Sequence, residues 1–270
     1  MDLNEFFKAL SSDRRLEILK VLAEHEEELR LSTIASKLNI PPPTVKDHLD
    51  KLLKSQLIKG EKFYSVKPIW KTIKAFLEPL NIIANSFDFL SNYELHNIPP
   101  QFVLRVHELE PVQIIESPSF LGEIVKSFQE EKQRELMFNA RVMGSFDLNL
   151  DASIGTIIAS TVNTSAYQFD FKFIISLKSL ETVKITPWQF INEYDNIVSL
   201  NDFRYLPMFP IHIIFFQLTN LGCVFFNKSG QADFRMGWKI THERGNKWLS
   251  DVFDYYWNQA LPLPKNNTDL

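Results

Sequence analysis

The sequence predicts an α+β protein with an N-terminal winged helix-turn-helix, a linker helix and a C-terminal α/β domain that contains a mixed sheet. Three observations support this class. Two short helical patterns meet across a tight break within residues 31–54, a long apolar helical repeat starts at Pro68, and β-branched and aromatic runs follow Pro99-Pro100. The chain has 270 residues, 45% of them hydrophobic, which suffices for two ordinary cores. We therefore expect domains at residues 1–66, 67–96 and 97–270.

The first two helical patterns predict a helix-turn-helix. Residues 31–38 start beside the hydroxyl groups of Ser32 and Thr33, which suit a helix cap. Residues 42–54 open with prolines, which a first helical turn tolerates because their missing N–H has no partner there. In this order of elements the second helix enters the major groove of DNA, and residues 59–66 would form a short wing. The apolar row of the second helix consists of Val45, Leu49, Leu52 and Leu53.

This row leaves the other face of residues 42–54 to solvent or DNA. From Lys46 to Lys74 there are eight lysines and three acidic residues, although the whole chain has a net charge of −4. A local positive charge is what the neutralisation of DNA phosphates requires, whereas many lysine-rich helix faces are only solvated surface. The candidate DNA-binding residues are Pro42, Thr44, Lys46, Asp47, His48, Lys51, Lys54 and, at the wing tip, Lys62.

At Pro43-Thr44-Val45 and His48-Leu49 the chain resembles the ArsR-like winged-helix regulators. The resemblance covers about residues 5–66 and implies a DNA-binding fold. Two positions depart from that family's pattern: Pro41 stands where a capping Ser is common, and Asp47 stands where a basic residue is common. Both would weaken or redirect base reading. Many of these relatives sense metals through thiols, but Cys223 is the only cysteine, so thiol-based sensing is not expected here.

A long amphipathic helix is predicted from Pro68 to Leu90, where apolar residues recur at steps of three and four. Pro79 should kink or split it, because an interior proline costs about 3 kcal/mol unless the chain bends. In the resembled family the segments that flank the DNA domain pair two protomers, which implies a homodimer that reads a promoter inverted repeat. The alternative is that this helix packs only on its own C-terminal domain. The candidate dimer residues are Trp70, Ile73, Leu77 and Leu80.

Several classes of function find no support in the sequence. No apolar run is long enough to span a membrane, and Asp2 and Glu5 stand where a secretion signal would be basic and then apolar, so a cytoplasmic protein is expected. The six histidines are scattered, with the stretch around His107 nearest to a metal-ligand pattern, so no metal or other cofactor is expected. Histidine-plus-lysine, nucleophile-elbow and phosphate-loop motifs are absent, so no catalytic residue is assigned and no enzyme is expected.

Beyond Pro99-Pro100 the sequence predicts the helices and strands of an effector domain. Helices are expected at residues 102–109, after Ser117-Pro118, and at 248–261, where an aromatic stripe would face the core. Strands are expected at 112–115, 142–148, 155–162, 171–177 and 183–186, with a buried hairpin at 211–217 and 223–227.

The boundary Ile98-Pro99-Pro100, the stretch Leu104 to Leu109, the helix start Glu116-Ser117-Pro118 and the closing helix from Trp248 to Ala260 resemble the archaeal Fil-type methanogenesis regulators. The end of the chain more remotely resembles the effector domain of the TrmB sugar regulators. These resemblances imply an archaeal transcription factor and leave its ligand open. Groups that would orient an anionic effector in an apolar cavity are Arg141, Arg204, His212 and Arg235, although isolated arginines more often form surface ion pairs.

The sequence thus predicts a dimeric, DNA-binding transcriptional regulator whose C-terminal domain senses an unknown small molecule or partner. The alternative is a protein-interaction module without sequence-specific DNA binding, in which Asp47 and Asp50 weaken the attraction to DNA. A third, remote option is a nucleotide-processing enzyme built on the C-terminal fold.

Overall fold

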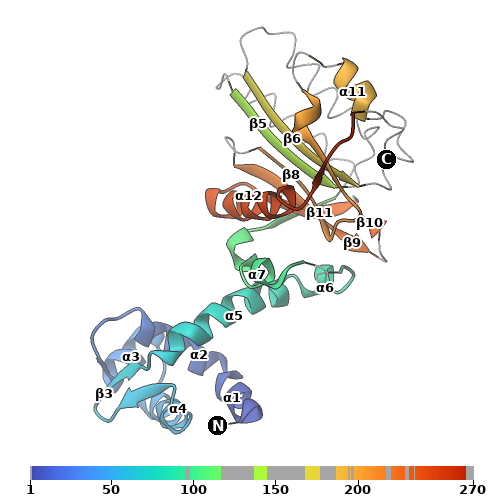
Figure 1. The fold of residues 1–270 in the computed structure, drawn as a ribbon. Coiled ribbons are helices and arrows are strands. Elements are labelled where there is room, and N and C mark those ends of the chain that lie inside the picture. Colours follow the sequence, from blue (N-terminus) through green and yellow to red (C-terminus); the bar gives the residue numbers. More distant parts are fainter. Residues whose placement is uncertain are drawn as a thin grey trace. The chain divides into compact units, whose positions relative to one another are not determined.

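Figure 1 shows the computed structural model of the chain. The structure describes residues 2–94, 98–116, 137–144, 168–176, 187–193, 195, 198–216, 220–228, 231–233 and 235–265. Its contacts divide the chain into two compact units, Met1–Glu78 and Pro79–Leu270. The division falls inside a helix, and each unit is described by itself below.

The first unit is a winged helix-turn-helix, which confirms the predicted fold class of this region. Its three short strands pair antiparallel in the order β1-β3-β2, so the wing is the β2-β3 hairpin. Its elements are α1 (Leu3–Leu10), α2 (Asp13–Ala23), β1 (Leu29–Arg30), α3 (Leu31–Leu38), α4 (Pro42–Lys54), β2 (Ile58–Gly60), β3 (Phe63–Val66) and the first part of α5 (Ile69–Asn85).

The predicted apolar row of α4 lies at the centre of the first unit's core. Val45, Leu49 and Leu52 are completely buried, and Leu53 packs partly buried against the same cluster. Ile34 of α3 is also completely buried there. Burial of each such side chain contributes about 1.5–3 kcal/mol to folding, so this row fixes which face of α4 turns inward. The polar residues of α4 are left on the outside.

A tight turn separates α3 from α4. Asn39 adopts the left-handed conformation with a φ of 52°, and its N–H donates to carbonyl groups in the last turn of α3. Pro41 occupies the cap position of α4 and Pro42 begins the helix, as the proline argument predicts. The expected hydroxyl cap of α3 is wrong, because Arg30 occupies that cap position without a side-chain hydrogen bond and Ser32 lies within the first turn.

The helix α5 is one element (Figure 1). It continues through Pro79, so of the two expected effects of this proline, a kink or a split, the split does not occur. The interruption comes later, at Ser86, after which the short helix α6 (Phe87–Leu90) follows. The helix contributes to both cores: Trp70 is buried in the core of the first unit, and Ile82 is buried in the core of the second.

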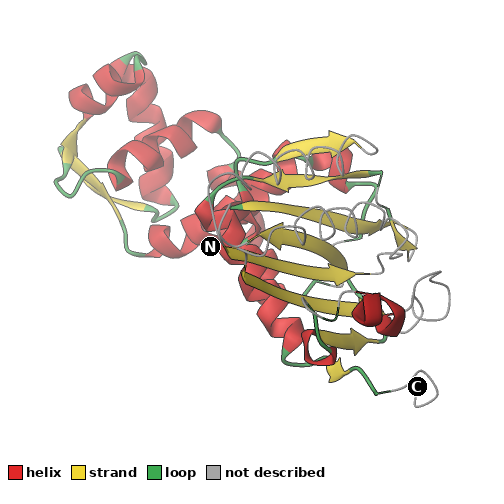
Figure 2. Ribbon diagram, turned by 90° about the horizontal axis from the view of Figure 1, so that it is seen from above, coloured by secondary structure: helices red, strands yellow, loops and turns green. Residues whose placement is uncertain are grey.

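The second unit contains a mixed sheet (Figure 2), which confirms the predicted fold class. Nine strands fall within its described residues. The strand order is β12-β7-β6-β5-β8-β9-β11-β4, and β10 pairs with β9. Strands β5, β6 and β7 are parallel to one another. The strands are β4 (Gln113–Glu116), β5 (Met137–Gly144), β6 (Gln168–Ser176), β7 (Phe203–Leu206), β8 (Ile211–Phe216), β9 (Leu221–Lys228), β10 (Gln231–Ala232), β11 (Met236–Ile240) and β12 (Leu261–Pro262).

The helix α12 (Glu243–Trp257) packs on this sheet. Trp248, Leu249, Val252 and Phe253 are buried in one cluster with sheet residues, which confirms most of the predicted aromatic stripe. The predicted end of the stripe at Leu261 is wrong, because the helix ends at Trp257 and Leu261 is 56% exposed in β12. Besides the end of α5 and α6, the helical segments among the described residues of this unit are α7 (Pro100–Val103), the 3-10 turn η1 (Val106–Leu109), α11 (Pro187–Glu193) and the 3-10 turn η3 (Leu200–Asp202).

The predicted hairpin at residues 211–217 and 223–227 is confirmed, because β8 and β9 pair antiparallel and are buried almost throughout. Strands β4 and β6 also lie where strands are expected, and β5 begins before the expected 142–148. The helix expected at 102–109 is instead the two separate turns α7 and η1. The helix expected after Ser117-Pro118 and the strands expected at 155–162 and 183–186 lie outside the described residues.

Candidate nucleic-acid interface

The exposed face of α4 carries most of the candidate DNA-binding residues. Pro42 and Thr44 lie exposed in its first turn. The prolines at positions 41–43 have no N–H, and the N–H of Thr44 already donates to the carbonyl of Pro41 at 3.0 Å. The backbone at this helix start therefore offers few donors to a phosphate. Contacts to nucleic acid from this end of α4 must come from side chains.

Two ion pairs connect the charged residues of this face. Lys46 Nζ lies 2.6 Å from Asp50 Oδ1, and Lys51 Nζ lies 2.6 Å from Asp47 Oδ2. The hydrogen bond to Asp50 raises the pKa of Lys46, and the hydrogen bond from Lys51 lowers the pKa of Asp47. The four side chains are 49–60% exposed, so both pairs can exchange partners with a ligand. With Lys54, three cations and two anions leave this face a net charge of +1.

His48 is half-buried on the same helix. Burial lowers the pKa of His48 below 6.5, and the charges of Lys51 and Arg15 act in the same direction against that of Asp47. The imidazole is therefore mostly neutral at pH 7. Its Nδ1 has no hydrogen-bond partner among the described residues. Because Nδ1 is buried, a neutral imidazole can offer a ligand only Nε2, as a donor or as an acceptor, and no positive charge.

The turn of the wing depends on Gly60, which has a φ of +124°. A Cβ at this position would lie 1.8 Å from the carbonyl oxygen of Phe63, so only glycine fits. Tyr64 is 2% exposed, and its hydroxyl donates to the carbonyl of Glu61 at 2.7 Å. The tyrosine therefore packs into the unit, and Lys62 is left exposed at the tip of the wing.

A notch of about 480 Å³ lies between the wing, the start of α3 and α4. Arg30, Lys46 and Lys62 bring three cations to it, against the single carboxylate of Glu61. The guanidinium of Arg30 stands 5.0 Å from the centre of the Phe63 ring, which is 41% exposed. The first N–H groups of α3 also lack a side-chain cap. Such uncapped N–H groups and neighbouring cations suit a phosphate.

Arg30 and Phe63 are not among the DNA-binding residues that the sequence predicts. β1 has only two residues, and its pairing of Arg30 with Phe63 joins segments 33 positions apart in the chain. No periodicity can reveal such a pair. One signal in the sequence could have identified Arg30: it is a basic residue directly before the predicted helix at 31–38.

The four candidate dimer residues of α5 differ in exposure. Trp70 is 2% exposed and Ile73 is 7% exposed, and Leu77 packs partly buried against the first unit's core. Leu80 is 50% exposed. The first three residues thus have apolar contacts within their own chain, and Leu80 is available to a partner. Two other exposed apolar residues of α5 are Ile69 and Phe76, at 51% and 55%.

Two of the candidate effector residues, Arg141 and Arg204, have partners inside the second unit. Arg141 is 6% exposed, pairs with Asp170 Oδ2 at 2.7 Å and donates to the carbonyl of Asp170 at 2.8 Å. Arg204 donates to the backbone carbonyl of Trp257 at 2.6 Å, and its guanidinium lies 4.4 Å from the centre of the Trp257 ring. These contacts join β5 to β6, and β7 to the end of α12.

The other two, His212 and Arg235, also have partners. His212 is 2% exposed with Nε2 2.8 Å from Asn227 Oδ1, and burial lowers the pKa of His212 to about 4. Arg235 is largely exposed and pairs with Asp233 at 2.8 Å, and the hydrogen bond from Arg235 lowers the pKa of Asp233 to about 2. By strand alternation His212 points to the opposite sheet face from Arg141, which lies beside Phe215. The structure does not bring the four residues together.

The stretch around His107 is the part of the sequence nearest to a metal-ligand pattern. In the structure its charged side chains form ion pairs. Arg105 donates to both carboxylate oxygens of Glu108 at 2.9 and 2.8 Å, and also to Asp251 at 2.8 Å. Within the described residues no group of three or more histidine, cysteine or acidic side chains is arranged to hold a metal ion. Of the helices that the structure describes, none has the length and apolar character needed to cross a membrane.

Comparison with known proteins bears on the first unit. Residues 12–59 match the family model described as bacterial regulatory protein, arsR family. The match runs from the start of α2 into β2 and so includes α3 and α4. A solved structure described as TrmBL2, an archaeal chromatin protein with a novel mode of DNA binding, aligns over 97% of this chain and 94% of its own, with 13% identity and a TM-score of 0.38. No curated protein matches the chain.

Proposed function

We propose that the chain is a transcriptional regulator that binds double-stranded DNA through α4 and the notch beside it. The observation that carries the proposal is the exposed polar face of α4 next to a notch with three cations. Thr44, Lys46 and His48 would reach base edges in the major groove, and Arg30 and Lys62 would contact phosphates. The arsR-family match of residues 12–59 supports this assignment.

The ion pairs of α4 set how strongly this face attracts DNA. Its net charge is only +1, because Asp47 and Asp50 offset two of the three lysines. Sequence-independent attraction to DNA grows with the number of phosphates that cations neutralise. We therefore expect weak non-specific binding, with Lys46 and Lys51 released from their aspartates only when DNA phosphates or bases replace them.

Alanine variants of the two lysines test this assignment. Lys46→Ala and Lys51→Ala should each weaken binding to a cognate fragment, with Lys51 acting through phosphates and Lys46 also through bases. Fluorescence anisotropy measures the affinity, and Lys20→Ala, which removes an exposed lysine from α2, is the matched control. Unchanged affinity in both variants contradicts the site assignment and favours the alternative, a protein-interaction module without sequence-specific DNA binding.

We further propose a homodimer that reads an inverted repeat. Ile69, Phe76 and Leu80 recur at steps of seven and four on α5, so they share one helix face, and all are at least half exposed. Sedimentation equilibrium at micromolar concentration should give a dimer for the natural chain and a monomer for Phe76→Glu. Lys71→Glu, an exposed charge change on the same helix, is the control. A natural chain with the mass of one copy would contradict this proposal.

We also propose that the second unit is an effector domain. The support is that a separate core of buried residues lies in the second unit, apart from the DNA-binding unit, and that the chain between Trp70 of one core and Ile82 of the other belongs to the helix α5. A small molecule found to raise the unfolding temperature of the full chain should then change its DNA affinity. Ligands that bind the second unit and leave DNA affinity unchanged would contradict the coupling.

A further inference from the structure

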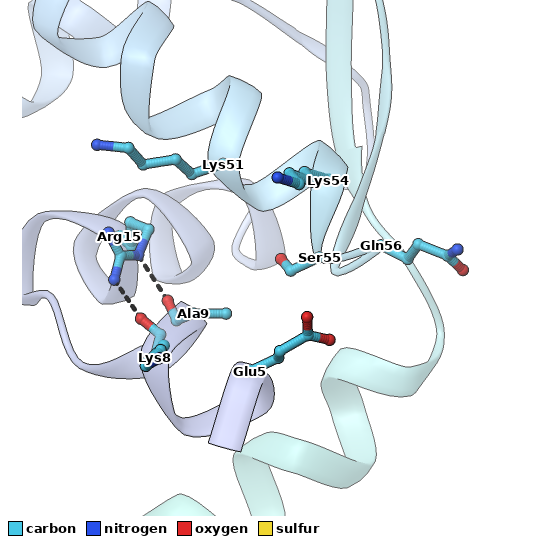
Figure 3. Close-up of a pocket in the computed structure, with 8 residues that line it drawn as sticks. All are labelled: Glu5, Lys8, Ala9, Arg15, Lys51, Lys54, Ser55 and Gln56. Carbon is cyan, nitrogen blue, oxygen red and sulfur yellow. Dashed lines mark hydrogen bonds between the residues drawn. The ribbon is translucent and has the colours of Figure 1, made fainter. Parts of the chain in front are cut away.

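A second basic pocket lies on the first unit, beside the C-terminal end of α4 (Figure 3). It has a volume of about 450 Å³, which lies within the range of small-molecule sites. The end of α1, the start of α2 and the end of α4 form its walls. It shares no lining residue with the notch beside the wing. The α4 helix therefore has a cationic recess at each end.

The pocket gathers positive charge from three helices. Lys51 and Lys54 come from α4, Lys8 from α1 and Arg15 from α2. Among the described residues that line the pocket, Glu5 is the only acidic one. The lining has four cations and one anion, and the Asp47 carboxylate that pairs with Lys51 at 2.6 Å brings the local net charge to +2. In the part of the chain that the structure describes, the ammonium groups of Lys8 and Lys54 form no ion pair. Neighbouring cations without counter-charges favour an anionic ligand.

Arg15 removes the main obstacle to an anion at this place. The carbonyl groups at the end of a helix carry partial negative charge and would repel it. The Nε of Arg15 donates to the carbonyl of Ala9 at 2.6 Å, and its Nη2 donates to the carbonyl of Lys8 (Figure 3). Two carbonyl groups at the end of α1 are thus already bonded. The Ser55 hydroxyl likewise donates to the carbonyl of Leu52 at 3.0 Å.

We propose that this pocket binds a small phosphorylated polyanion of nucleotide size, and that the bound polyanion competes with DNA. A di- or triphosphate carries several anionic groups, which matches a lining whose cations come from three helices. Lys51 belongs to this pocket and also to the DNA-binding face, so the competition rests on the proposed function. A polyanion that holds Lys51 and Lys54 removes phosphate contacts from α4 and adds negative charge beside it. DNA must then weaken polyanion binding by the same factor.

Calorimetric titration of the full-length chain with pyrophosphate and with ATP, without DNA, tests the site. Both probes should bind. Lys8→Ala and Lys54→Ala should each weaken binding by about fivefold, the size expected for one lost charge-assisted contact of an exposed cation. Glu5→Gln should strengthen it, because it removes the repelling carboxylate. Lys20→Ala outside the pocket should leave it unchanged, and circular dichroism checks that each variant is folded. Absence of binding of both probes, or an equal loss in Lys20→Ala, overturns the proposal.

A second experiment separates a free polyanion from the phosphates of DNA itself. DNA affinity is measured with and without pyrophosphate or ATP at constant ionic strength. The polyanion should weaken DNA binding by the natural chain and have less effect on Lys8→Ala, which leaves α4 intact. If no probe binds and Lys8→Ala instead lowers the salt dependence of DNA binding, the pocket belongs to the DNA footprint and the proposal is overturned. Polyanion binding by a chain that does not bind DNA supports the pocket and refutes only the proposed function.

Discussion

The aspartates of α4 make a prediction whose direction is unusual for a DNA-binding helix. Asp47→Asn removes a carboxylate that lies 2.6 Å from Lys51 Nζ, and the two side chains are 60% and 54% exposed. The lysine is then released to a DNA phosphate without an ion pair to break. We expect Asp47→Asn to bind random DNA more tightly than the natural chain. Lys51→Ala should do the opposite.

The magnitude follows from the number of phosphate contacts. Each additional neutralised phosphate steepens the plot of log affinity against log salt by about 0.9, which corresponds to about 3.5-fold in affinity between roughly 50 and 200 mM salt. Asp47→Asn should therefore steepen the slope by up to about 0.9, and Lys51→Ala should flatten it by a similar amount. Asp50→Asn, which releases Lys46 from an equally short ion pair, should behave like Asp47→Asn.

Fluorescence anisotropy in a salt series, with random DNA and with a promoter fragment, measures both slopes. Glu78→Gln is the matched control, because it removes one carboxylate from an exposed ion pair with Lys74 at the same helical spacing on α5. The reasoning is refuted if Asp47→Asn weakens binding to the promoter fragment alone and leaves the slope unchanged. That result would mean that Asp47 accepts a hydrogen bond from a base, as an acidic side chain does from cytosine.

Three further predictions concern the stability of the two units. Gly60→Ala should destabilise the first unit by about 1–3 kcal/mol, because a Cβ would lie 1.8 Å from a carbonyl oxygen; Ser65→Ala in the same wing is the control for urea unfolding. Trp248→Ala should lower the unfolding free energy of the second unit by about 3–5 kcal/mol, and a loss below 1 kcal/mol would contradict its place in the core. Because the pKa of His212 falls to about 4 on folding, the unfolded chain binds more protons between about pH 4 and 6.5. The contribution of neutral His212 to the unfolding free energy should be complete above pH 6.5. It should be lost as the pH falls towards 4, by up to about 3 kcal/mol. In His212→Gln, the unfolding free energy should no longer change with pH for this reason.

Local patterns in the sequence were sufficient to predict the first unit's helices. The prolines before Thr44 and the apolar row that includes Val45 and Leu49 are signals within one helix, and they are confirmed. The two ion pairs of α4 were also accessible, because Lys46 and Asp50 stand four residues apart in the sequence. Counting lysines without pairing them overstated the positive charge of the helix.

Contacts between distant segments could not be predicted in the same way. The β8-β9 hairpin was predicted because its strands are neighbours in the chain, but β4 pairs with β11 from about 120 residues away. Arg141 meets Asp170 only because β5 and β6 run parallel with that register. Isolated basic residues therefore suggested a common effector site, although each has a separate partner in the fold.

The central claim is that this chain reads DNA, and binding of the full-length protein to a DNA fragment carrying its own promoter tests it most directly. The measurement is a salt series with random DNA as competitor. The account predicts selective binding whose log affinity falls with log salt by about 0.9 for each phosphate contact. Binding that is absent, or equal for promoter and random DNA, would contradict it.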